Sequence, residues 1–117
     1  MYTQEDVRKL FMQRGEIEME LKVRQAQYYG REAEIPSEMA ARVMELQREL
    51  MTIDGFFAAL SENEAFVIQH HLMEELDWPQ TMALFAQKWG VEAEKSLRSM
   101  KALQEKGLRK IARLLNS

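Results

Sequence analysis

The chain has 117 residues, 30% of them charged, and a formal net charge of −3 at pH 7, which suits one ordinary domain with a sizeable core. Cysteine is absent, which excludes a disulfide framework, a thiolate nucleophile and a cysteine-based zinc site. The sequence has no signal-peptide pattern at its start and no apolar run near the ~18 residues of a membrane span, so we expect a cytoplasmic protein without a membrane partner.

Helix-forming residues dominate, glycine and proline are few, and no useful period-two pattern marks a strand, so we predict an all-α fold. The first predicted helix covers residues 4–29. Thr3 and Asp6 have the spacing of an N-terminal capping pair, and Gly30 is a natural C-terminal stop. One face carries an apolar stripe made of Val7, Leu10, Ile17, Leu21 and Tyr28.

The second predicted helix covers residues 37–60, with Ser37 as its expected N-cap and Gly55 as a point where it can bend or break. Its apolar positions repeat at alternating spacings of four and three, which is the pattern of a sustained heptad seam. Because only a short loop separates the two helices, we expect residues 1–60 to form an antiparallel helical hairpin. The seam consists of Met39, Val43, Leu46, Leu50, Ile53, Phe57 and Leu60.

Three further helices are predicted in residues 61–117. Ser61 and Glu64 form a capping-box pattern ahead of the first. The Asp77-Trp78-Pro79 run places a cap at Asp77 or Trp78 and proline in the first turn of the second, which Gly90 ends. The three predicted helices cover residues 62–74, 79–89 and 92–115.

The last quarter of the chain is basic, although the protein as a whole is acidic. Residues 91–117 contain seven cations and three acids, a net charge of +4, so residues 1–90 carry −7. On a helical wheel six of the seven cations, all except Lys101, share one side, and Leu97, Met100, Leu108, Ile111 and Leu115 share the other. Such a helix can dock on a core and present a row of cations to a polyanion, which releases its condensed counterions on binding. The cations are Lys95, Arg98, Lys101, Lys106, Arg109, Lys110 and Arg113.

The other candidates for catalysis or metal binding are better explained by structural roles. His70 and His71 are adjacent, so on a helix they diverge by about 100° and cannot easily share one metal ion. No catalytic triad order, phosphate-binding glycine loop or zinc-protease motif is present, so we expect no enzyme activity, metal or cofactor. Trp78, Phe85 and Trp89 have the helical spacing of core residues. Four methionines lie off the main seams and favour a second contact surface that could receive another protein: Met12, Met19, Met44 and Met51.

Residues 60–115 give a short helix, a helix with an apolar stripe, a tight glycine turn and a long basic helix. The stretches that carry a family resemblance are Leu60-Ser61, Glu64, Val67-Ile68, Leu76-Asp77-Trp78, residues 85–91 and residues 106–111. On these residues the chain resembles the region-four domain of bacterial sigma factors and, more closely, the small phage transcriptional regulators built on it. The resemblance implies a tri-helical helix-turn-helix domain in residues 61–117 that binds double-stranded DNA and regulates transcription, in a protein of phage or prophage origin.

The resemblance places the first turns of the last helix in the major groove, where early residues reach base edges and later ones the phosphate backbone. Helix-turn-helix proteins commonly read two half-sites, so we expect a homodimer, with the acidic hairpin contacting the second copy or RNA polymerase. Glu92 and Glu94 near the start of this helix favour its dipole but repel phosphate, so Glu94→Gln should tighten binding. The candidate DNA-binding residues are Lys95, Arg98, Ser99, Lys101, Lys106 and Arg109.

A second hypothesis is a helical protein–protein adaptor that does not bind DNA and whose basic face meets an acidic partner or solvent. One structural observation separates the two hypotheses. DNA binding is favoured if Lys95 and Arg98 are exposed on a protruding helix beside the Gly90 turn. The adaptor is favoured if they pack against the acidic hairpin.

Overall fold

The computed structural model describes residues 1–93 and 95–117, and this part of the chain is helical and contains no strand, which confirms the all-α prediction. It holds five α-helices joined by short connecting helices. The connecting helices are η1 (Glu32–Glu34), η2 (Phe57–Ala59), the π-helical η3 (Ile68–Met73) and η4 (Val91–Ala93). The α-helices are α1 (Gln4–Gln27), α2 (Ser37–Phe56), α3 (Glu62–Val67), α4 (Trp78–Trp89) and α5 (Leu97–Leu115).

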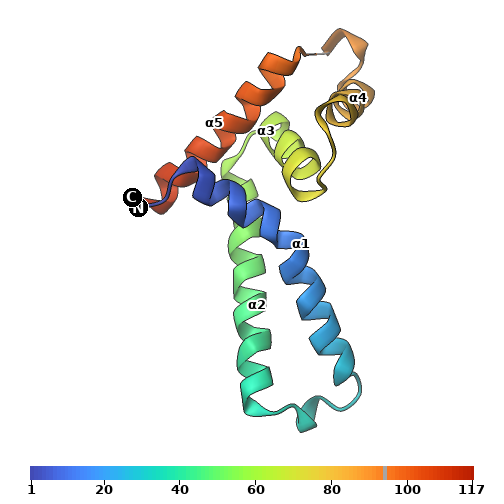
Figure 1. Cartoon of the computed structure of the whole chain (residues 1–117), viewed down its shortest axis with the longest axis vertical. Helices are drawn as coiled ribbons and strands as arrows, with labels where there is room; N and C mark the ends of the chain where they lie inside the picture. Colours follow the sequence, from blue (N-terminus) through green and yellow to red (C-terminus); the bar gives the residue numbers. More distant parts are fainter. Residues whose placement is uncertain (94) are drawn as a thin grey trace.

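α1 and α2 lie side by side, run in opposite directions and project from the other helices along the 55 Å long axis of the molecule (Figure 1). Each contributes buried leucine, Leu21 on α1 and Leu46 on α2. Ion pairs cross between them, from Arg14 Nε to Asp54 Oδ1 at 2.7 Å and from Arg42 Nε to Glu20 Oε2 at 2.8 Å. The two helices are therefore joined by apolar contacts and by charged side chains at their borders.

The base of this helix pair packs on α5 and η3 through one apolar cluster. Phe11 is fully buried there, and its ring meets Phe56 and Phe57 edge to face with centroid distances of 5.8 and 5.4 Å. The two chain ends also meet, because the Tyr2 amide donates to Asn116 Oδ1 at 2.7 Å and Asn116 Nδ2 donates to the Tyr2 carbonyl at 2.8 Å. Residues before and after position 60 thus share a core, which consists of Val7, Phe11, Ile53, Ile68, Leu72, Leu108, Ile111 and Ala112.

A second apolar cluster joins α3, α4 and α5. Phe85 is buried at its centre, with Trp78 and Trp89 packed against it, as their helical spacing predicts. α5 comes very close to the α3–η3 segment at Gly107, where a Cβ atom would lie 2.8 Å from Ile68 Cδ1. The cluster consists of Val67, Phe85 and Met100, with Phe66, Trp78, Met82, Trp89 and Leu103 around them.

Side-chain caps set three of the helix starts as predicted. Thr3, Ser61 and Asp77 each accept a hydrogen bond from an amide three residues on, and each forms a reciprocal capping box. The prediction that Ser37 caps α2 is wrong. Pro36 occupies the N-cap, and its carbonyl accepts from the Ala40 amide at 2.9 Å, so Ser37 is the first residue of the helix, which has no side-chain cap.

Two predicted helices are divided in the structure. The predicted helix at 37–60 changes after Gly55, since α2 ends at Phe56 and η2 continues the chain. The predicted helix at 62–74 is α for its first six residues and π-helical in η3. The wider turns of η3 lead to Glu75, which has a φ of 57° and reverses the chain toward α4.

Candidate nucleic-acid interface

The connection between α4 and α5 differs from the prediction of one helix over residues 92–115. Gly90 ends α4 with a φ of 91°, a left-handed conformation that glycine adopts without steric cost. η4 follows, and α5 begins only at Leu97, because the Ser96 hydroxyl caps it by accepting from the Ser99 amide at 3.1 Å. Glu94, for which we predicted a repulsive effect on DNA, lies outside the described residues.

The later start of α5 changes the setting of three candidate residues. Lys95 is half-buried and precedes the helix, so its placement on the recognition helix is corrected. Arg98 is exposed in the first turn. Ser99 is also exposed, but its amide and hydroxyl both contact the Ser96 hydroxyl at 3.1 Å, so this serine takes part in the N-cap.

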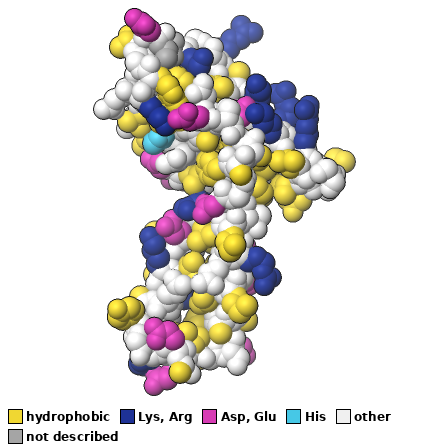
Figure 2. All heavy atoms as spheres, turned by 180° about the vertical axis from the view of Figure 1, so that it is seen from behind, with side chains coloured by type: hydrophobic (Ala, Val, Ile, Leu, Met, Phe, Trp, Pro, Cys, Tyr) yellow, Lys and Arg dark blue, Asp and Glu magenta, His cyan; other side chains and the backbone are white. Residues whose placement is uncertain are grey.

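The outer side of α5 carries an exposed row of five cations, which we call the α5 cation row. Glu105 is the one acid among the described residues of this helix. No member of the row forms an ion pair with another residue of the described ranges. Figure 2 shows dark-blue Lys and Arg side chains gathered over the part of the molecule that holds α5. The row consists of Arg98, Lys101, Lys106, Arg109 and Arg113.

The opposite side of α5 is buried and mostly apolar, as the helical wheel predicts, and Gln104 is its one buried polar side chain among the described residues. Met100, Leu108 and Ile111 are fully buried. Leu97 is the exception, since it is 41% exposed in the first turn, ahead of the position where α5 meets the second cluster at Met100. The helix is therefore anchored over most of its length and presents its cations from a fixed base.

Lys110 does not belong to the exposed row, although the sequence placed it on the same side. Its Nζ lies 2.7 Å from Oε1 of Glu64, a carboxylate that is only 1% exposed. The same oxygen accepts from the Ser61 amide at 2.8 Å. Burial raises the pKa of the Glu64 carboxyl, but these hydrogen bonds and the Lys110 charge outweigh burial, so its pKa lies below its usual value. The pair fixes the start of α3 to the middle of α5.

The two histidines shape the connection between α3 and α4. His71 Nδ1 lies 2.9 Å from the Leu76 carbonyl oxygen, and its ring stacks on Trp78 with a centroid distance of 3.6 Å. Burial lowers the pKa of His71, which favours its neutral form. His70 Nδ1 instead lies 3.0 Å from Glu74 Oε1. Within residues 1–93 and 95–117, no three His, Asp or Glu side chains are grouped so that they could hold a metal ion.

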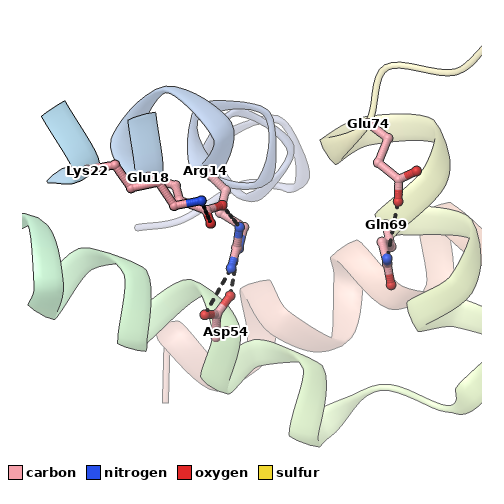
Figure 3. Close-up of polar contacts among 6 residues, drawn as sticks. All are labelled: Arg14, Glu18, Lys22, Asp54, Gln69 and Glu74. Carbon is pink, nitrogen blue, oxygen red and sulfur yellow. Dashed lines mark hydrogen bonds and ion pairs between the residues drawn. The ribbon is translucent and has the colours of Figure 1, made fainter. Parts of the chain in front are cut away.

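The acidic half of the molecule uses many of its carboxylates in internal ion pairs. In Figure 3, Arg14 lies between Asp54 and Glu18, and it donates to both. Arg42 and Arg24 hold the pKa of the Glu20 carboxyl at about 2. The sequence does not predict the cross-helix pairs to Asp54 and Glu20, because residues 40 and 22 positions apart give no local signal.

Among the described residues, no helix has the length and apolar character needed to cross a membrane. Comparison of the chain with protein-family models, curated proteins and solved structures found no match.

Proposed function

We propose that the chain is a DNA-binding transcriptional regulator that inserts the start of α5 into the major groove. The observation that carries this proposal is the α5 cation row, five exposed cations on a helix whose other side is buried. Cations fixed on a rigid helix neutralise phosphates and release their counterions without a large loss of backbone freedom. The proposal includes a sigma-region-four-like helix-turn-helix, with α4 and α5 as its two principal helices.

The position of α5 supports this proposal. Its first turn lies at the end of the molecule away from the tip of the α1–α2 pair, and Arg98 is exposed there (Figure 1). The adaptor hypothesis is favoured if Lys95 and Arg98 pack against the acidic helix pair, and of these two residues Arg98 is exposed whereas Lys95 is half-buried. The adaptor hypothesis can still hold if the α5 cation row binds an acidic protein, and the experiment below includes this outcome. In the proposed mechanism the α1–α2 pair is left free for RNA polymerase or a second copy.

The candidate residues divide by their position along α5. Arg98 and Lys101 occupy the first turns, where a recognition helix reaches base edges. Lys106 and Arg109 lie further along and would contact the phosphate backbone. Lys95 precedes the helix, and we assign it a phosphate contact at the groove edge.

Fluorescence anisotropy with mixed-sequence duplex DNA at several salt concentrations tests the proposal. If the protein neutralises roughly 3–6 phosphates, the logarithm of affinity should fall against the logarithm of salt with a slope of about −3 to −5. Arg98→Ala and Lys101→Ala should weaken binding more than Arg113→Ala, because only the first turns enter the groove. If Arg98 contacts a guanine edge, its loss should cost about 1–3 kcal/mol and relax specificity at one position.

Lys22→Ala is the matched control. It removes an exposed cation from α1, away from α5, and changes the net charge by the same amount. This variant should bind as the unmodified protein does. Absence of any anisotropy change at low salt, with folded protein in large excess, would reject the DNA proposal. Binding to an acidic protein under the same conditions would then favour the adaptor.

A further inference from the structure

α2 carries a second seam on the side away from Leu46 and Ile53, which are its buried residues. Four positions recur at spacings of four, three and four, which is the spacing of core positions in a coiled coil. None of them is charged, although 30% of the chain is. Figure 2 shows hydrophobic side chains along the projecting helix pair. This outer seam consists of Ala40, Met44, Gln47 and Met51.

Of the four outer-seam residues, Ala40 is half-buried and the other three are exposed. Met44 is 59% exposed and Met51 is 75% exposed. Exposure of methionine side chains to water is unfavourable, and their flexible thioethers suit packing against another helix. We infer that a second copy of this chain packs its α2 antiparallel against the outer seam, giving a two-fold symmetric dimer. This inference goes beyond DNA binding and does not rest on it.

The sequence of the seam fits an antiparallel register centred between Glu45 and Leu46. In this register Ala40 faces the partner's Met51, and Met44 faces the partner's Gln47. A small side chain thus lies opposite a large one at each end, which lets two helices interdigitate. The two-fold axis produces every contact twice, so four positions in each chain make a closed interface.

Charge complementarity also favours this occupant. Arg48 borders the outer seam, is exposed, and makes no ion pair with any residue that the structure describes. In the proposed register it approaches the partner's Glu45, an acid whose side chain is 56% exposed and which contacts Arg42 at 3.3 Å. Two such pairs border the interface and place opposite charges together.

α1 has an outer stripe with the same spacing, but it is a poorer interface. Met12, Met19 and Val23 are exposed there, and Glu16 lies between the two methionines. In a self-paired α1 dimer Glu16 would face the partner's Met19 and lose water without gaining a cation. The uncharged seam on α2 has no such cost.

Sedimentation equilibrium at tens of micromolar tests the inference. The unmodified protein should be a dimer, and Met44→Lys or Met51→Lys should raise the dissociation constant by at least about tenfold. Met19→Lys is the matched control, because it adds the same charge at an exposed methionine of α1, and it should leave the dissociation constant unchanged. Both α2 methionines are exposed, so helical circular dichroism should remain unchanged in these variants. A monomeric unmodified protein would overturn the inference.

Disulfide cross-linking tests the register, since the chain has no cysteine of its own. A mixture of Met44→Cys and Gln47→Cys proteins should oxidise to a linked heterodimer, whereas each variant alone should stay largely unlinked. Efficient linkage of either variant alone would overturn the antiparallel register. A molecular mass in sedimentation equilibrium that rises beyond that of a dimer with concentration would overturn the closed interface. It would indicate that the outer seam of one copy packs on the α1 stripe of the next, which forms an open chain. These variants leave α5 unchanged, so DNA binding by a monomeric Met44→Lys protein would separate the two proposals.

Discussion

Lys110→Met should lower the free energy of unfolding by about 2–4 kcal/mol, because it leaves the buried Glu64 carboxylate without its cation. Glu64 is 1% exposed, and its Oε1 accepts from Lys110 Nζ at 2.7 Å and from the Ser61 amide at 2.8 Å. Breaking a fully buried pair costs about 3–5 kcal/mol. The Lys110 side chain is 38% exposed, so water screens part of the interaction and reduces the expected loss of unfolding free energy.

This loss should depend on pH with a defined sign. The folded pKa of Glu64 lies below its usual value of 4.5, since its hydrogen bonds outweigh the effect of burial. A carboxyl with a lowered folded pKa contributes stability above its unfolded pKa, and that contribution is lost as pH falls through the folded value. The difference in unfolding free energy between the unmodified protein and Lys110→Met should therefore be largest near neutral pH and shrink below about pH 4.

Urea unfolding followed by circular dichroism measures these free energies. Lys22→Met is the control, because it removes an exposed pair with Glu18 at 3.1 Å, and such pairs contribute about 0–1 kcal/mol. The double variant Glu64→Gln with Lys110→Met should recover part of the loss, since it leaves no unpaired buried charge. A Lys110→Met protein no less stable at neutral pH than Lys22→Met would refute the reasoning.

Two further stability predictions follow from packing. Leu46 is fully buried and Leu50 only partly, so Leu46→Ala should cost about 2–5 kcal/mol and Leu50→Ala clearly less, as measured by urea unfolding. Equal costs would mean that the α1–α2 contact is misassigned. Gly15→Ala should raise the melting temperature, because Cβ meets no atom there and alanine favours a helix by about 0.5–1 kcal/mol. Gly107→Ala should lose that gain, because its Cβ would lie 2.8 Å from Ile68 Cδ1, and an equal rise in both variants would contradict this packing.

The helix starts at Ser61 and Asp77 could be predicted because their signals are local. A side-chain oxygen at the N-cap and a side-chain acceptor three residues later bind backbone amides that have no partner within the helix. Both capping boxes form in the structure. The buried face of α5 could also be predicted from spacing alone, since one apolar side of a helix must be covered. Leu108 and Ile111 are fully buried accordingly.

The polar contact between α3 and α5 could not be predicted in the same way. Lys110 and Glu64 are 46 residues apart, and only the crossing of α5 over α3 brings them together. In the sequence Lys110 is one of several cations with the same helical spacing, so nothing distinguishes it from Arg109. The start of α5 at Leu97 differs from the predicted start at Glu92 for a related reason. Glu92 is compatible with a helix, but Ser96 supplies the better cap, and the chain uses it.

The start of α5 at Leu97 leads to a last prediction, about the charge that enters the groove. Among described residues, Glu105 is the one acid on the exposed side of α5, two turns after Arg98. If these turns approach phosphates, Glu105→Gln should tighten DNA binding by up to about 1 kcal/mol, or about fivefold, at low salt. The gain should fall as salt rises, because added ions screen the repulsion. Glu16→Gln on α1 also neutralises an exposed acid and should change affinity little. Equal effects of the two variants in the anisotropy titration would mean that only net charge matters and that α5 does not enter the groove.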